Sequence, residues 1–179
     1  MRVIARRGMT AATMQEIAEE AGVAKGTIYL YFKDRDELVE KTFDRAITEL
    51  HKQIDVALER DGKFEQKLRA VLAAEMAFFR EHREFFRLYI SLRYPEGKRQ
   101  KRACAPQYQS RLARIATELE AAMKRGEIRK MDPKRLALFI SEGISAVIIQ
   151  RVIEEAPPPE SVDIDLLAGA ILDGIGSRS

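Results

Sequence analysis

Residues 13–32 constrain the fold more than any other stretch, because they follow the pattern of two short helices joined by a glycine turn. Thr13 and Glu16 fit a capping box, in which a threonine oxygen accepts a backbone amide and the glutamate reaches back to the cap. Gly22 suits the left-handed conformation that ends a helix and begins a tight turn. The pattern predicts a helix-turn-helix, in which one helix braces and the next enters the major groove of DNA.

The second short helix carries different chemistry on its two sides. Ile28 and Phe32 are four residues apart, so they share the side that packs on the core. The other sides carry hydroxyl, aromatic and basic groups, which suit contact with phosphates and base edges. Gly26 has no side chain and permits close approach to a groove, and Lys33 follows where a cation meets phosphate. The candidates on these sides are Lys25, Gly26, Thr27, Tyr29, Tyr31 and Lys33.

These residues carry a resemblance to a known family. Residues 10–43 resemble the DNA-binding domain of the tetracycline-repressor (TetR) family of bacterial transcription regulators. The matching positions are Thr13, Glu16-Ile17-Ala18, Ala21-Gly22-Val23, Lys25-Gly26-Thr27-Ile28-Tyr29, Tyr31-Phe32-Lys33 and Leu38. Beyond residue 45 the resemblance is one of architecture only.

The resemblance implies two domains with different functions. Residues 1–44 would form the helix-turn-helix domain and residues 45–179 a helical domain for ligand binding and dimerisation. Thr13 would touch the DNA backbone, with Lys25, Gly26, Thr27 and Tyr29 facing the DNA and Tyr31 and Lys33 on flanking phosphates. The family comprises homodimers, mostly repressors, that a small ligand releases from a palindromic operator.

One departure from the family pattern concerns the start of the chain. The family normally has a full helix before the bracing helix, whereas residues 2–8 match only the end of one, with Gly8 as its stop. We therefore expect a shortened first helix, a less stable DNA-binding domain and weakened DNA affinity. Restoring an upstream helix should raise the melting temperature.

Composition sets broader bounds. The 179 residues are 46% hydrophobic, enough for one large or two small domains, and the net charge of +3 is compatible with DNA binding without demanding it. Cys104 is the single cysteine, so no intrachain disulfide can form, and with no signal peptide this favours a cytoplasmic protein. Both a redox sensor and an ordinary thiol remain open for Cys104. No apolar run is long enough for a membrane span.

Helical periodicity continues to the end of the chain, with almost no strand signal, which predicts an all-α fold. Asp132 and Pro133 form a helix start, with a capping carboxylate and a proline in the first turn. The apolar stripes predict helices over residues 38–58, 64–79, 85–92, 108–123, 133–148 and 166–175. A basic run at residues 98–102 is interpreted as an exposed loop and helix start rather than a second binding surface.

The last two predicted helices are apolar around more than one stripe, which would leave an exposed apolar surface on a monomer. Small residues among them allow close helix approach. A two-fold four-helix interface explains this pattern, and burial within one subunit is the alternative. The predicted interface residues are Phe139, Gly143, Val147, Ile148, Leu167, Ala170 and Ile171.

Aromatic residues concentrate between residues 78 and 89, which indicates either core packing or a mostly apolar ligand cavity with a few polar anchors. Glu75 and Glu142 interrupt apolar helix faces, so each is either an anchor or a glutamate that pairs with an arginine or lies at the edge of its stripe. Arg93 is a further anchor candidate. The predicted pocket residues are Glu75, Met76, Phe79, His82, Phe86, Tyr89, Tyr108, Met123 and Glu142.

Together these patterns predict a ligand-responsive repressor that binds double-stranded DNA as a homodimer, with a small, largely apolar effector. The alternative is a helix-turn-helix module that binds protein and reads no specific operator. An enzyme is disfavoured, because His51 and His82 lie on different predicted helices and no nucleophile, phosphate-loop or metal-spaced motif occurs. The pattern calls for no cofactor, no metal and no membrane.

Overall fold

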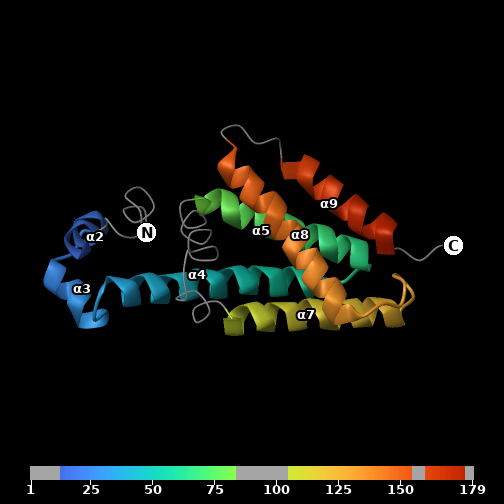
Figure 1. Ribbon diagram of the computed structural model, residues 1–179, viewed down its shortest axis with the longest axis horizontal. Helices are drawn as coiled ribbons and strands as arrows, with labels where there is room; N and C mark the ends of the chain where they lie inside the picture. The colour runs from blue at the N-terminus through green and yellow to red at the C-terminus, as the bar shows by residue number, and fades with distance from the viewer. Residues whose placement is uncertain (1–12, 84–104, 155–159, 176–179) are drawn as a thin grey trace. The chain divides into compact units, whose positions relative to one another are not determined.

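The computed structural model describes residues 13–83, 105–154 and 160–175, and the elements in these ranges are all helices (Figure 1). Their bounds are α2 Met14–Ala21, α3 Lys25–Tyr31, α4 Arg35–Leu58, α5 Phe64–Glu81, α7 Ala105–Lys124, α8 Pro133–Ile153 and α9 Glu160–Ile175. The all-α prediction is confirmed. None of the described helices has both the length and the apolar character needed to cross a membrane.

Some predictions fall on other parts of the chain. The shortened first helix, the helix at residues 85–92, the basic run at 98–102 and Cys104 lie outside the described residues. They remain predictions.

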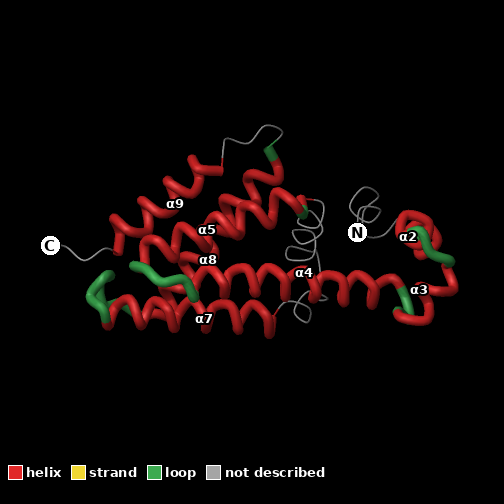
Figure 2. Tube along the Cα trace, turned by 180° about the vertical axis from the view of Figure 1, so that it is seen from behind, coloured by secondary structure: helices red, strands yellow, loops and turns green. Residues whose placement is uncertain are grey.

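The described residues group into two compact units, and α4 contributes to both (Figure 2). The first, called the head, contains α2, α3, α4 as far as Glu49, and the described residues 81–83. The second, called the body, runs from Leu50 to Arg80 and continues from Ala105. The predicted domain boundary after residue 44 falls inside α4 and stays a prediction.

The start and end of α2 follow from the residues predicted to cap it. The Thr13 hydroxyl accepts the Glu16 amide at 3.2 Å, and the Glu16 carboxylate accepts the Thr13 amide at 3.0 Å, which completes the capping box. Gly22 ends the helix with φ of 69°, in the left-handed region that favours glycine. The Val23 amide donates to the Ala18 carbonyl at 3.0 Å, which closes the turn.

The head has a small core of its own. Ile28 is the buried residue of α3 and anchors that helix, while Phe32 packs partly buried against the same cluster. The cluster joins residues from all three head helices: Met14, Ile17, Ala18, Ile28, Leu38 and Val39. Because α3 has only one buried side chain, its position depends on this small cluster rather than on its own propensity.

The body packs α7 against α8 and α8 against α9, and α5 adds further buried apolar side chains. Leu72, Leu119 and Ile144 are almost completely buried and come from α5, α7 and α8. Asp132 caps α8 as predicted, since its carboxylate accepts the amides of Lys134 and Arg135 at 2.9 and 3.1 Å.

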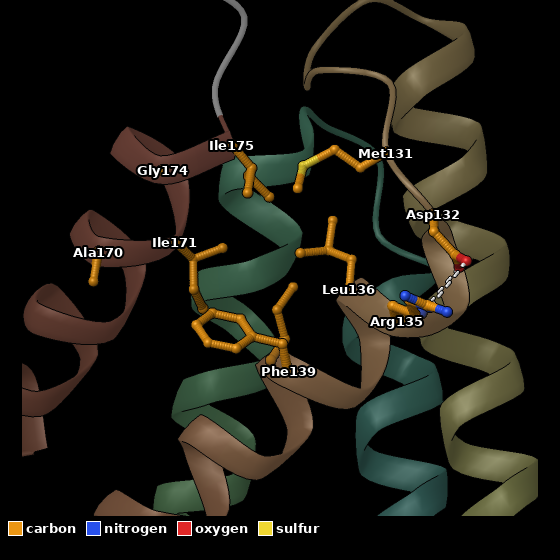
Figure 3. Close-up of a pocket in the computed structure, with 10 residues that line it drawn as sticks. Met131, Asp132, Arg135, Leu136, Phe139, Ala170, Ile171, Gly174 and Ile175 are labelled. Atoms are coloured by element: carbon orange, nitrogen blue, oxygen red, sulfur yellow. Dashed lines mark hydrogen bonds and ion pairs between the residues drawn. The ribbon is translucent and has the colours of Figure 1, made fainter.

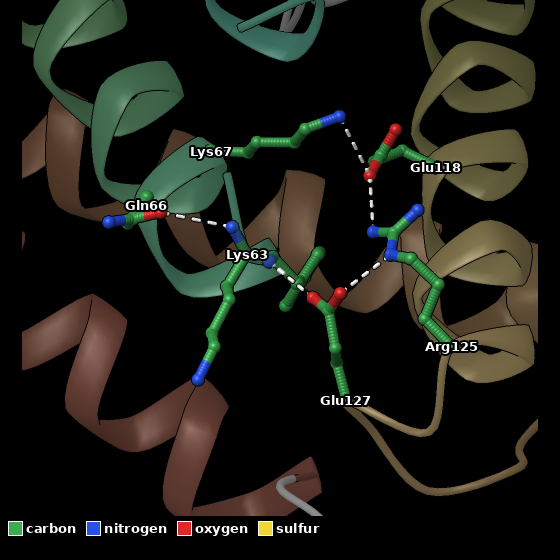
Figure 4. Close-up of polar contacts among 7 residues, drawn as sticks. Lys63, Gln66, Lys67, Glu118, Arg125 and Glu127 are labelled. Carbon is green, nitrogen blue, oxygen red and sulfur yellow. Dashed lines mark hydrogen bonds and ion pairs between the residues drawn. The ribbon is translucent and has the colours of Figure 1, made fainter. Parts of the chain in front are cut away.

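A polar network joins the end of α7 to the start of α5 (Figure 4). Glu118 pairs with Lys67 at 3.2 Å and with Arg125 at 3.0 Å. Glu127 pairs with Arg125 at 2.6 Å and accepts the Phe64 amide, which lies in the first turn of α5. The network therefore satisfies a free helix amide and fixes the segment that leads into α8.

Candidate nucleic-acid interface and effector site

The predicted DNA-binding residues of α3 share the surface that its core contact leaves free. With Ile28 turned to the core, every predicted contact on this helix is exposed: Lys25, Gly26, Thr27, Tyr29 and Tyr31. The Lys25 ammonium lies 6.0 Å from the centroid of the Tyr29 ring, at the outer range of a cation–π contact. The face therefore combines a cation, hydroxyl groups and aromatic rings.

Thr13 and Lys33 lie at the ends of the helix pair. The Thr13 side chain is exposed but already forms the cap of α2, so any phosphate contact would share a hydroxyl with that cap. The Lys33 ammonium is exposed and 3.9 Å from Asp34, a long surface pair of little energetic weight. The Lys33 amide donates to Glu37 at 2.6 Å, which holds the turn into α4.

Glu37 has a second partner in the same turn. Its carboxylate pairs with Lys41 at 2.9 Å. The hydrogen bond from Lys41, followed by the Lys33 amide, lowers the pKa of Glu37 below its ordinary value. This carboxylate is therefore charged at neutral pH and already satisfied by its neighbours.

Sequence reasoning missed one residue of the exposed α3 face. Leu30 is 81% exposed, the most exposed of the large hydrophobic residues among the described part of the chain. The sequence could have predicted this exposure. Leu30 comes two residues after the core residue Ile28, and a step of two residues turns a helical side chain by roughly 200°.

In the body, one buried and one half-buried polar pair connect helices at the predicted effector site. Glu75 on α5 is only 1% exposed and pairs with Arg111 on α7 at 2.9 Å. The Tyr108 hydroxyl, one turn earlier on α7, donates to Glu142 on α8 at 2.5 Å. Tyr108, Glu75 and Glu142 were predicted, whereas Arg111 was missed.

Burial raises the pKa of Glu75, and the Arg111 guanidinium opposes that rise. His51 on α4 is half-buried, and its burial, followed by the nearby Arg111 charge, lowers its pKa. His51 is therefore neutral at physiological pH, which leaves the Arg111 guanidinium as the cation that faces Glu75.

The other predicted pocket residues have different surroundings. Met76 and Phe79 are buried on α5, and Met123 is half-buried near the end of α7. His82 is exposed just after α5, so it is not among the buried residues. Phe86, Tyr89 and Arg93 lie outside the described residues.

The predicted dimer residues divide between the surface and the core. Phe139 is 69% exposed and Ala170 is exposed, while Gly143 and Val147 are half-buried. The assignment of the remaining three to a surface needs correction, because the chain itself buries Ile148, Leu167 and Ile171. They face neighbouring helices of the same chain, which was the alternative left open for these helices.

Other apolar side chains extend the exposed surface of α8 and α9. Leu138, Val162 and Leu166 are exposed beside the predicted residues. Figure 3 shows an apolar groove between the start of α8 and the end of α9, with Leu136, Ile171 and Phe139 along it and Asp132 and Arg135 at its rim.

Comparison with known proteins finds a family match at the start of the chain. Residues 1–42 match the family of bacterial regulatory proteins described as the tetR family. The chain is 27% identical over 164 residues to an uncharacterized HTH-type transcriptional regulator, YhgD, from Bacillus subtilis. This alignment covers 92% of this chain and 84% of that protein.

Solved structures share the fold over nearly the whole length. The fatty acid degradation regulator FadR from Bacillus halodurans superposes with a TM-score of 0.87 at 18% identity, covering 97% of this chain and 94% of that one. The transcriptional regulator FadR from Bacillus subtilis, in complex with stearoyl-CoA, gives a TM-score of 0.82 at 21% identity over the same shares. At these identities the likeness concerns the fold alone.

Proposed function

The chain belongs to the TetR family of DNA-binding transcriptional regulators, and from that premise we propose that it is a ligand-responsive repressor of a palindromic operator. The observation that carries the proposal is the exposed face of α3, where Lys25, Thr27, Tyr29 and Tyr31 surround a helix held by one buried residue. A surface of this chemistry suits a major groove better than solvent.

Each residue of the face has a proposed role in DNA binding. Lys25 and Tyr29 reach base edges from the first and second turns of α3, and Thr27 lies between them in sequence. Tyr31 and Lys33 contact the flanking phosphates, where a cation releases counterions and makes binding salt-dependent. Thr13 adds a backbone contact at the start of α2.

We expect dimerisation because a single head covers only a short stretch of DNA. One recognition helix contacts few base pairs, so two heads are needed for a specific operator, and two-fold symmetry then implies a palindrome. The exposed apolar residues of α8 and α9, including Phe139 and Leu166, support an isologous interface there.

The effector is proposed to bind in the body beside the polar pairs of Glu75 with Arg111 and Tyr108 with Glu142. Met76, next to Glu75 in the sequence, is buried, and an apolar side chain beside charged groups suits a molecule that is mostly apolar with one polar end. The stearoyl-CoA held by the Bacillus subtilis regulator makes a long acyl thioester the first effector class to test.

Release from DNA requires the effector to favour one of two states. An effector that binds more tightly to a state whose heads no longer match successive major grooves shifts the population toward that state. The same coupling requires operator DNA to weaken effector binding by an equal factor.

Selection of bound sequences from random DNA tests operator recognition directly, followed by mobility shifts over a salt series. The expected result is a palindrome bound with strong salt dependence. Lys25→Ala and Tyr29→Ala should each weaken binding by about tenfold or more, as loss of a base contact does. Lys52→Ala, an exposed lysine on α4, is the matched control and should bind as the wild type does.

The outcomes separate the proposal from its alternative. Equal binding of all sequences, or wild-type affinity in both variants, would overturn specific operator reading and favour a protein-interaction module. For the effector, stearoyl-CoA should release the operator while coenzyme A alone should not. Release by both compounds, or by neither, would reject a long acyl thioester as the effector.

A further inference from the structure

Leu30 on α3 is the most exposed large hydrophobic residue in the described part of the chain. It lies nearly opposite Ile28, the residue that α3 buries, and is therefore at the centre of the exposed face. Leaving a leucine side chain in water forgoes a large part of the stabilisation that its burial would give. Isolated exposed hydrophobic residues are common, but this one occupies the middle of the proposed DNA-reading surface.

Gly26 lies one turn before Leu30 on the same side of the helix. Its backbone has no left-handed conformation, since the positive-φ glycines of the described residues are Gly22, Gly62 and Gly126. A Cβ atom built on Gly26 would meet nothing within 4 Å, so the fold has room for a side chain there. Because glycine weakens a helix relative to alanine, its presence indicates a close approach by a partner from outside.

Gly26 and Leu30 thus form an apolar strip on α3. At Gly26 the backbone is uncovered, and at Leu30 an exposed side chain projects from the helix. Polar and aromatic groups flank it, with Lys25 and Tyr29 on one side and Thr27 on the other. Flanks of this kind can pair with donors and acceptors on neighbouring bases, whereas the strip itself has no side-chain donor or acceptor to offer.

The edges of base pairs in the major groove carry hydrogen-bonding groups and one apolar group, the C5-methyl of thymine. A leucine pressed against an amino or carbonyl group would leave that group without a partner, which is costly. We propose that Leu30 packs against a thymine methyl group, with Gly26 allowing the backbone close enough, and that Leu30 thereby specifies thymine at one position of each half-site. This inference rests on the proposed function, since it requires that α3 enters the major groove.

Replacing thymine by uracil removes only the methyl group, so it tests this contact directly. Starting from the selected operator, each thymine is replaced in turn in both half-sites, and affinity is measured for the wild type and for Leu30→Ala. We expect the wild type to lose about fourfold per half-site at one position, the value of one buried methyl group. Leu30→Ala should bind the thymine operator more weakly and show no further loss with uracil at that position.

Two controls separate the methyl contact from other effects. Val56→Ala removes an apolar side chain that is 60% exposed on α4, and it should keep the wild-type sensitivity to uracil. A C·G pair and its 5-methylcytosine counterpart at the same position distinguish recognition of the methyl group alone from recognition of the whole T·A pair. Tighter binding of the methylated pair would support a contact with the methyl group, whereas equal binding would contradict it.

The possible failures are distinguishable. If no sequence is selected from random DNA, the proposed function fails and the role of Leu30 fails with it. If an operator is selected but no thymine is sensitive to uracil, or Leu30→Ala keeps the sensitivity, operator reading stands and the role of Leu30 is wrong. Thermal unfolding of Leu30→Ala should match the wild type, because the side chain has almost no contacts to lose.

Discussion

At the scale of single residues, Gly26 serves the proposed interface at the expense of helix stability. Gly26→Ala should stabilise the head by up to about 1 kcal/mol, because alanine favours the helix and its methyl group meets no neighbour. The same methyl group should lower operator affinity by about tenfold, since it stands where the groove approaches. Hydrogen exchange of the α2 and α3 amides and mobility shifts measure the two effects.

Lys52→Ala is the control for this prediction. Lys52 is exposed on α4 and outside the proposed DNA and dimer surfaces, so its replacement should leave operator affinity unchanged. An unchanged affinity in Gly26→Ala would contradict close approach at α3. A loss of stability in the same variant would show that Gly26 has a role in the fold after all.

The Glu75–Arg111 pair is the other residue-scale feature with a clear energetic consequence. Arg111→Met leaves a buried carboxylate without its partner and should destabilise the chain by about 3–5 kcal/mol. Replacing both residues by methionine should cost much less, because no uncompensated charge then remains buried. Urea unfolding of the two single variants and the double variant measures the coupling between them.

The pH dependence of the stability of Arg111→Met provides a second test of the Glu75–Arg111 ion pair. Without the opposing guanidinium, burial should hold the pKa of Glu75 still further above its ordinary value of 4.5. A folded pKa above the unfolded one means that folding is favoured at low pH and loses that advantage as pH rises through the interval between them. Stability of Arg111→Met that is independent of pH across this interval would argue against a buried, unpaired carboxyl.

At the scale of the elements, the network around Glu127 should make the connection from α7 to α5 sensitive to acid. The Arg125 side chain and then the Phe64 amide hold the pKa of Glu127 below 4.5, so the carboxylate stabilises the fold at neutral pH and loses this effect as pH falls through its folded pKa. Glu127→Gln should therefore melt below the wild type at neutral pH, with the difference shrinking in acid. Thermal unfolding across a pH series measures it, and Glu120→Gln, an exposed glutamate of α7, is the control.

The elements were largely predictable because their ends carry local signals. Thr13 with Glu16, Gly22, and Asp132 before Pro133 each act within one helical turn, and the structure uses them as expected. The contact between Arg111 and Glu75 joins separate helices, and no periodicity identifies which of many arginines a buried glutamate will choose. The sequence therefore predicted the exposed face of α3 better than the polar centre of the body.

At the scale of the whole molecule, the apolar character of α8 and α9 has two causes that the sequence could not separate. Both helices are apolar around much of their circumference, so a stripe facing the chain's own core resembles a stripe facing a second copy. The structure buries Ile148, Leu167 and Ile171 within one chain and leaves Phe139 and Leu166 exposed. Only the second set remains available for the proposed dimer.

Because Phe139 is exposed, replacing it tests dimerisation without disturbing the core of the chain. Phe139→Glu places a charge on the exposed face, and in a two-fold interface the same charge enters from both copies, so dissociation to monomers is expected. Sedimentation should show the shift, and operator affinity should fall toward that of a single half-site because one head contacts few base pairs. Val56→Glu, on an exposed part of α4, should remain a dimer with wild-type affinity. A dimeric Phe139→Glu would place the interface elsewhere, whereas a monomeric variant with undiminished operator affinity would separate DNA reading from dimerisation.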